Sequence, residues 1–274
     1  MSLQTLMHPE VWREKITEIF LAKTKFLDTL PVERRLTKKV HYFVQKTVAM
    51  TPEIFVHGAG LPYSMGTYEK EDATPELYGY GIEILKIDVD LLPFGWNTVR
   101  REIEQKATGM ALYLDKRISD AMVAGAGITR SCSSSKWTTP ANIMAPVIDM
   151  IKQLEAANND LDSLVFVVSP YNHAYILASL VQTALTMSPP GKVENGRVTE
   201  YLGLPVQVSN NMTTPQTAII YSKNNYGWLN ECYPLTTMGP KYDEDLMAYR
   251  AQMYAMNVPV VDQPMAVATM TSTY

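Results

Sequence analysis

The residue types that most often carry out chemistry in proteins are few in this chain and lie far apart in it. The four histidines, His8, His41, His57 and His173, show none of the short spacings at which histidines of one element bind a metal ion together. We therefore predict no metal site.

The two cysteines, Cys132 and Cys232, belong to no paired motif, so we expect reduced thiols and no disulfide framework. Cys132 could form a nucleophile pair with His173, because an imidazole can deprotonate a thiol. However, Cys132 lies in the serine-rich run 131–135, away from any helix start that would lower its pKa. An inert thiol is the favoured interpretation.

The acidic run Asp243-Glu244-Asp245 is the remaining candidate for acid–base chemistry, and adjacent acids of this kind are more typical of a solvated turn. Nucleotide-binding and hydrolase motifs are absent. Gly58-Ala59-Gly60 lacks the third glycine of a dinucleotide fingerprint, and Gly79-Tyr80-Gly81 leads into a strand pattern. We therefore predict a protein that is not an enzyme, with no catalytic or cofactor-binding residues and no cofactor.

The composition indicates a globular protein. Its 274 residues, 46% of them hydrophobic, are enough for one large domain or two ordinary ones. Charged residues make up only 19%, and Met and Tyr are plentiful at 16 each, which suits surfaces buried between subunits or an ordinary core. No apolar run reaches the length of a membrane span, so we expect a soluble, intracellular chain with no membrane partner.

Charge is distributed unevenly along the chain, whose net charge is −4. Residues 1–46 hold nine Lys or Arg against five Asp or Glu, so this part is basic and the rest is acidic. A basic N-terminal arm could contact a phosphate backbone or an acidic neighbour, and a solvated helix of mixed charge explains the pattern equally well.

The elements of the first third follow from periodicity. A helix is predicted over 9–30, ended by Pro31, with the apolar side chains of Trp12, Ile16, Ile19, Phe20 and Leu27 on one face. Extended segments are predicted over 40–50, 54–56 and 80–89, around a polar tip at 68–75. Such a projecting hairpin cannot bury both its faces within one subunit. The alternative is a β-ribbon packed on its own domain.

A long helix is predicted over 98–123, capped by Asn97 or Thr98. One face is apolar for about seven turns, and the helix would be roughly 40 Å long; its residues are Val99, Ile103, Ala107, Met110, Leu114, Ile118 and Ala121. Gly109 could mark a bend. A mobile connector follows over 128–137.

A compact α/β unit is predicted over 162–222. A helix starting at Thr139-Pro140 leads to it, with an apolar face of Ile143, Val147, Ile148, Ile151 and Leu154. The unit itself has a strand at 163–168, a helix capped by Ser169-Pro170, and three short strands at 197–201, 206–208 and 217–221. Six residues of its helix recur at three- and four-residue spacing, as a helical row does: Tyr171, Ala174, Tyr175, Ala178, Val181 and Leu185. Beyond this unit, turns are predicted at 226–228 and 233–234, a long strand from Asp245, and another strand at 265–270.

The order of these elements and several short motifs resemble the tailed-phage major capsid proteins with the Hong Kong 97-type fold. The motifs are Ser169-Pro170 after a strand, Gly196-x-Val198, Tyr201-Leu202-Gly203-Leu204-Pro205-Val206, and Val208-Ser209-Asn210-Asn211. Upstream, the long helix closes on Gly125-Ala126-Gly127, which is similar to the end of the family's spine helix. Each motif is weak alone, and their order carries the resemblance.

The resemblance implies an α+β, Hong Kong 97-type fold in five parts. These are an N-terminal arm (1–36), an E-loop with flanking strands (37–93), a P domain with the spine helix (94–136), an A domain (137–240) and the C-terminal P-domain strands (241–274). It also implies self-assembly, as pentamers and hexamers, into an icosahedral shell around nonspecifically bound double-stranded DNA. The protein would be made in the host cytoplasm and become part of the virion, with scaffold, portal and decoration proteins as further partners.

Two other functions stay open at this stage. An encapsulin nanocompartment shares this fold and encloses enzyme cargo, and an enzyme or ligand-binding α+β oligomer is the rival from a different class. Some members of the resembling family also cross-link a lysine to an asparagine of a neighbour. Here the pair would be Lys70 or Lys86 with Asn257, near Glu69, Glu71 and Glu83.

Overall fold

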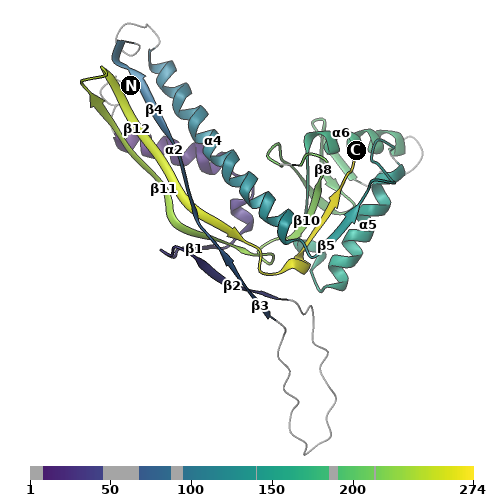
Figure 1. The fold of residues 1–274 in the computed structure, drawn as a ribbon. Coiled ribbons are helices and arrows are strands. Elements are labelled where there is room, and N and C mark those ends of the chain that lie inside the picture. Colours follow the sequence, from purple (N-terminus) through teal and green to yellow (C-terminus); the bar gives the residue numbers. More distant parts are fainter. Residues whose placement is uncertain (1–8, 46–67, 88–94, 140, 185–190, 213) are drawn as a thin grey trace, which may run out of the picture. The chain divides into compact units, whose positions relative to one another are not determined.

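The computed structural model describes residues 9–45, 68–87, 95–139, 141–184, 191–212 and 214–274 (Figure 1). The chain divides into two compact units, each assembled from separate stretches of sequence. Unit 1 comprises Met1–Val40, Ala73–Ile118 and Leu229–Pro259, and unit 2 comprises His41–Asp72, Ser119–Trp228 and Val260–Tyr274.

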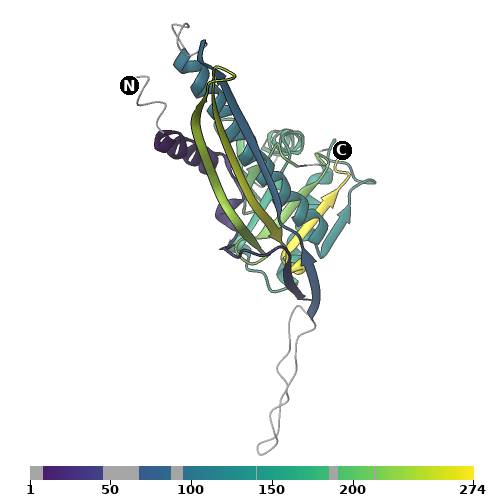
Figure 2. The same ribbon diagram turned by 60° about the vertical axis from the view of Figure 1, so that its left-hand side comes forward.

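Unit 1 is built on a long helix and a four-stranded sheet. The helices are α2 (Pro9–Lys23), the 3-10 turn η1 (Leu27–Thr29) and α4 (Gly95–Gly125), whose last residues, from Ser119, belong to unit 2. The strands, in sheet order, are β1 (Val32–Glu33), β11 (Trp228–Asp243), β12 (Ala248–Val260) and β4 (Glu76–Leu85). Strand β12 pairs antiparallel with β4 over ten residue pairs, from Ala248↔Leu85 to Asn257↔Glu76. Figures 1 and 2 show α4 running alongside this pair of strands.

The predicted long helix is present as one continuous element of 31 residues. The side chains of its predicted apolar face from Val99 to Ile118 are buried. The predicted cap is wrong, because α4 begins at Gly95 and Asn97 and Thr98 lie inside it. Gly109 makes room for a neighbour, since a Cβ there would lie 3.2 Å from Cε2 of Tyr80.

The first helix is shorter than predicted. Trp12, Ile16 and Phe20 are buried as expected, but α2 ends at Lys23 instead of continuing to residue 30. The backbone N–H groups of Lys25 and Phe26 donate to the carboxylate of Asp115 on α4. These two N–H groups would have bonded to carbonyl groups of α2 if the helix had continued. They bind instead to a side chain 90 positions away, and the helix ends.

The predicted hairpin is wrong in its pairing. Residues 68–75 do not form a tip, because Tyr68–Ala73 is strand β3, which pairs with β2 (Val40–Gln45) in a two-stranded ribbon. Residues of the predicted strand 80–89 belong to β4, which pairs with β12 instead. The predicted strand at 54–56 and most of 46–67 lie outside the described residues.

Unit 2 contains a seven-stranded sheet with two helices on one face. The helices are α5 (Ala141–Ala156) and α6 (Pro170–Ala184), with the 3-10 turns η2 (Leu161–Ser163) and η3 (Pro264–Ala266) between elements. The strands, in sheet order, are β5 (Ile128–Ser131), β13 (Val267–Thr271), β10 (Ala218–Ser222), β6 (Leu164–Val168), β9 (Leu204–Val208), β8 (Arg197–Tyr201) and β7 (Gly191–Glu194).

One apolar core joins both helices to this sheet. Leu164, Phe166 and Val168 alternate along β6 and so share one face, and they belong to the same cluster as Ile143 of α5 and Ile176 of α6. The predicted strands of the α/β unit are therefore confirmed as the centre of unit 2 (Figure 1).

The predicted mobile connector at 128–137 is wrong. Its first residues form β5, which pairs in parallel with β13, and Cys132 and Trp137 are fully buried. The N–H of Cys132 donates to the carbonyl of Thr271 at 2.8 Å. The N–H of Trp137 donates to the carbonyl of Thr273 at 2.6 Å. The strand was missed because its sequence is rich in serine and its partner, β13, lies far along the chain. The predicted turn at 233–234 is likewise part of a strand, β11.

The buried sides of both helices in unit 2 match the predicted apolar rows only in part. On α5, Ile143, Val147 and Leu154 are buried, but Ile148 is 46% exposed. On α6, Tyr171, Ala174, Ala178 and Val181 of the predicted row are exposed, Tyr175 is half-buried against the core, and Leu185 lies outside the described residues.

Candidate functional site

Cys132 and His173, which could have formed a nucleophile pair, each lie in a different environment and do not act together. Burial raises the pKa of the Cys132 thiol, which disfavours the reactive thiolate. The Nε2 atom of His173 accepts the N–H of Val198 at 3.0 Å, and burial lowers the pKa of this imidazole. Within the described residues no hydrogen bond joins Cys132 to His173.

The remaining candidate ligands and acids are dispersed or paired. Over the part of the chain that the structure describes, no three His, Cys, Asp or Glu side chains gather as metal ligands would. His41 pairs with Asp72 on the ribbon, and His8 and His57 lie outside the described residues. In the predicted acidic turn, Asp243 forms an ion pair with Arg250 at 3.0 Å.

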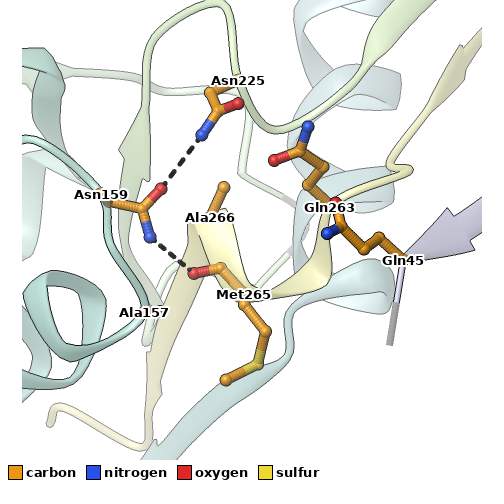
Figure 3. A pocket seen from close by; sticks show the side chains of 7 residues that line it. All are labelled: Gln45, Ala157, Asn159, Asn225, Gln263, Met265 and Ala266. Atoms are coloured by element: carbon orange, nitrogen blue, oxygen red, sulfur yellow. Dashed lines mark hydrogen bonds between the residues drawn. The ribbon is translucent and has the colours of Figure 1, made fainter. Parts of the chain in front are cut away.

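A small polar cavity lies in unit 2, beside the start of β13 (Figure 3). Its volume of ≈ 40 Å³ suits a water molecule or two and is far below that of a substrate pocket. The amide of Asn159 donates to the carbonyl of Met265 at 2.9 Å and accepts from Asn225 at 3.3 Å. The hydrogen bonds around the cavity therefore hold three segments of unit 2 together, and the cavity is too small for a substrate.

A larger open groove of ≈ 520 Å³ lies along β11 and β12 in unit 1. Its most prominent cation, Arg250, is already paired with Glu83 at 2.9 Å and with Asp243. Met238 and Tyr242, which also line it, are 54% and 40% exposed. This groove is a surface for another macromolecule more than a pocket for chemistry.

Apolar side chains are exposed at several further places in unit 1. Leu77 on β4 is 66% exposed, and Met247 in the β11–β12 turn is 65% exposed. Leu85 and Leu246 add to this surface. Leu85 pairs with Ala248, next to Leu246 and Met247, whereas Leu77 pairs with Met256 towards the other end of the ladder. Exposed apolar groups of this kind are typical of interaction surfaces.

The ribbon β2–β3 carries aromatic side chains into solvent. Phe43 is 63% exposed and Tyr68 is 54% exposed. The ribbon is fixed internally by the Tyr42 hydroxyl, which donates to Glu71 at 2.9 Å, and burial together with Glu71 raises the pKa of Tyr42 to about 12. A stiff ribbon with exposed aromatic rings can bind an apolar surface of another molecule.

A polar cluster that the sequence did not predict ties α4 to the sheet of unit 1. Arg117 donates to the backbone carbonyl of Asn257 at 2.9 Å, lies 3.4 Å from the carboxylate of Glu76, and stacks over the ring of Tyr78 at 5.7 Å. The Asn257 amide donates to the Tyr78 hydroxyl at 2.8 Å. Its members come from α4, β4 and β12, which no local sequence pattern relates.

The same cluster contains Asn257, the asparagine of the cross-link that the family resemblance suggested. Asn257 is only 2% exposed, and its amide is engaged within its own unit. Lys86 lies over the ring of Tyr242, 5.5 Å from its centroid. The burial of Asn257 weighs against a bond to a lysine of another copy. We therefore expect intact-mass measurement of dissociated particles to show a single monomer mass, and a ladder of subunit multiples would contradict this expectation.

Helix α6 presents an apolar surface outward from unit 2. Its buried side is partly polar. The Asn172 amide donates to the carbonyl of Thr217 at 3.2 Å and accepts from the Thr273 hydroxyl at 2.8 Å. Because Asn172 finds these partners inside, the helix turns Tyr171 and Val181 to solvent, where they are 63% and 59% exposed.

Comparison with solved structures identifies the fold. The chain is similar to a virus-like particle from Pyrococcus furiosus, with a TM-score of 0.63 and 13% identity over 95% of this chain and 98% of the other. It is similar to the capsid of cyanophage P-SCSP1u, with a TM-score of 0.68 and 10% identity over 90% and 88%. An encapsulin from Synechococcus elongatus matches with a TM-score of 0.63 and 10% identity over 94% and 89%.

No family model and no curated protein matches the chain. The likeness in structure nevertheless extends over nearly the whole of both chains in each case. The predicted fold class, α+β of the Hong Kong 97 type, is therefore confirmed.

Proposed function

We propose, from the Hong Kong 97-type fold that this chain has in common with those particle proteins, that it is a structural major capsid protein. In this proposal it self-assembles into an icosahedral shell that encloses double-stranded DNA. The observation that carries the proposal is the shared fold over 90% of this chain and 88% of the cyanophage P-SCSP1u capsid chain. The exposed apolar surfaces on strands, ribbon and helix α6 support it, because assembly would remove them from water.

The mechanism is mechanical. The continuous helix α4 and the ten-pair β12–β4 ladder give unit 1 stiffness, and the Arg117 cluster joins the two. Exposed apolar groups then bind neighbouring copies. Many modest contacts, repeated by symmetry, give a closed shell its strength. No residue in this scheme acts as a catalyst.

The partners in this scheme are copies of the chain, as pentamers and hexamers, with scaffold, portal and decoration proteins in addition. The protein would be made in the host cytoplasm and end in the virion. None of the helices in the described part of the chain combines the length and the apolar character that crossing a membrane requires. The five-part division into arm, E-loop, P domain and A domain belongs to the same proposal.

Contact with DNA would be nonspecific and electrostatic. The basic arm is one source of positive charge, although several of its cations already have acidic partners. Lys15 pairs with Glu18 at 2.6 Å, and Arg34 pairs with Glu231 at 2.9 Å. The contribution of the arm to DNA binding should therefore be smaller than its sequence charge suggests.

The second candidate is a nanocompartment shell that encloses enzyme cargo. The encapsulin match favours it, with a TM-score of 0.63 against 0.68 for the cyanophage capsid. The contents of the particle separate the two functions, because the fold is common to both.

Two measurements test the proposal. Electron microscopy of the full chain, expressed alone and with its scaffold where one is found, should show closed shells of uniform size. Particles from the natural source should contain nuclease-resistant double-stranded DNA. Particles that hold a second protein and no nucleic acid would support the nanocompartment instead. A chain that stays a small discrete oligomer under all these conditions would contradict both.

A further inference from the structure

Helix α6 contains no Asp, Glu, Lys or Arg among its 15 residues. Helix α2 has the same length and contains six. A helix with one face in solvent normally carries charged residues on that face. The absence of charged residues from α6 is therefore unusual for a helix with an exposed face.

Only one side of α6 is covered within its own unit. Ile176 and Leu180 face the sheet and are almost fully buried. The outward stripe, which we call the α6 face, consists of Tyr171, Ala174, Ala178 and Val181. Their spacing of three or four residues places them in one row, about 15 Å long.

An aromatic cluster lies at one end of the α6 face. The ring of Tyr274 lies 5.6 Å from that of Tyr171 and 6.0 Å from that of Tyr175, which makes an aromatic cluster at one end. Ala174, Ala178 and Val181 continue the row away from this cluster, and all three are exposed. Aromatic groups are enriched, and charged residues depleted, at the centre of protein interfaces.

We infer that the α6 face is buried against a second copy of this chain when the protein assembles. This inference rests on the proposed function, since assembly is what brings copies together. The charge pattern argues for a copy. The chain has a net charge of −4, so identical copies repel one another, and they meet at least electrostatic cost where neither presents a charge. Nucleic acid has no cation to bind on this face.

A charge placed on the α6 face should therefore block assembly. Ala178→Glu puts a carboxylate in the middle of the row, and we expect the protein concentration needed for particle formation to rise at least tenfold. Ala178→Gln, of similar size and no charge, should have a clearly smaller effect. Lys152→Glu, at an exposed position on the neighbouring helix α5, is the matched control and should assemble as the wild type does. Circular dichroism of the unassembled variants should show unchanged helix content.

A chemical probe identifies what covers the face. In the variant Ala178→Cys the introduced thiol is exposed on the single chain, whereas the native Cys132 and Cys232 are buried. We expect a water-soluble maleimide to label the introduced thiol readily in dissociated chains and at least tenfold more slowly in particles made of this variant alone. Rapid labelling in those particles would overturn the inference, and so would protection that appears only after another protein is added.

The two experiments also separate this inference from the proposed function. Closed shells in which the introduced thiol stays reactive, or normal assembly of Ala178→Glu, would overturn the inference and leave the shell function intact. Small oligomers with a protected introduced thiol and no shells would support the inference and contradict the shell. A chain that stays monomeric, with the introduced thiol reactive at every concentration, would contradict both.

Discussion

Helices α2 and α6 have the same length and opposite surfaces. On α2, three large apolar side chains, Trp12, Ile16 and Phe20, are buried and the other side is charged. On α6, the buried side includes the polar residues Asn172 and Ser179, and the apolar row is exposed. The difference teaches that an apolar stripe indicates burial somewhere, either in the chain's own core or against another molecule.

The largest effect should come from the buried row of α2. Trp12→Ala removes a side chain that is 1% exposed, and we expect the free energy of unfolding of the unassembled chain to fall by about 3–5 kcal/mol. Chemical denaturation followed by circular dichroism measures this. A loss below about 1 kcal/mol would mean that α2 is not part of the core of unit 1.

The next effect concerns the polar side of α6. Asn172→Ala leaves the carbonyl of Thr217 and the hydroxyl of Thr273 without their amide partner in a buried place, which we expect to cost about 2–3 kcal/mol. Thermal unfolding of the unassembled chain gives the comparison. Ser179→Ala, at another buried position of the same helix, is the comparison for loss of a single hydroxyl, which interacts with Tyr201. Equal, small losses for the two variants would contradict the role given to Asn172.

A smaller, pH-dependent effect concerns the end of α2. Burial raises the pKa of Asp115 from 3.8 to about 6, despite the N–H groups of Lys25 and Phe26 that donate to it. The folded chain therefore holds a proton more tightly than the unfolded chain does. The ionised carboxylate lowers stability above pH 6, and this loss is relieved as the pH falls from 6 towards 4.

Asp115→Asn should remove this dependence. Between pH 7.5 and 4.5 the wild-type chain should gain about 2 kcal/mol of stability relative to the variant, because one unit of pKa difference corresponds to about 1.4 kcal/mol. The measurement is urea denaturation of both proteins across this pH range. Parallel curves for the two proteins would show that Asp115 does not titrate between these limits.

How far the sequence predicts this fold depends on the range of the interaction. Local signals worked well: Ser169 accepts the N–H of Asn172 at 3.2 Å as the predicted helix cap, and α4 and the strands β6, β8, β9 and β10 lie where periodicity placed them. Long-range partners could not be predicted. The pairing of β4 with β12 and of β5 with β13 joins segments that no local pattern relates.

The same limit applies to the candidate site. The apolar residues of α6 were recognised, but their direction was not, because it depends on whether Asn172 finds partners inside. The end of α2 was missed because the Asp115 carboxylate that stops it lies on another helix. In both cases the apolar pattern alone was not enough to predict the outcome. A single polar side chain, bonded to residues far away in the sequence, sets the orientation of α6 and the end of α2.

The smallest effect on the single chain should come from the exposed row of α6. Tyr171→Ser and Val181→Ser remove apolar groups that are already in water, so each should change the free energy of unfolding of the unassembled chain by less than about 0.5 kcal/mol. This loss in the free energy of unfolding is far smaller than the one expected for Trp12→Ala, although all three residues belong to apolar stripes of 15-residue helices. The same denaturation experiment measures all three variants side by side. If Val181→Ser destabilised the unassembled chain as much as Trp12→Ala does, the row would already be part of a core within unit 2, and the contrast between the two helices would not hold.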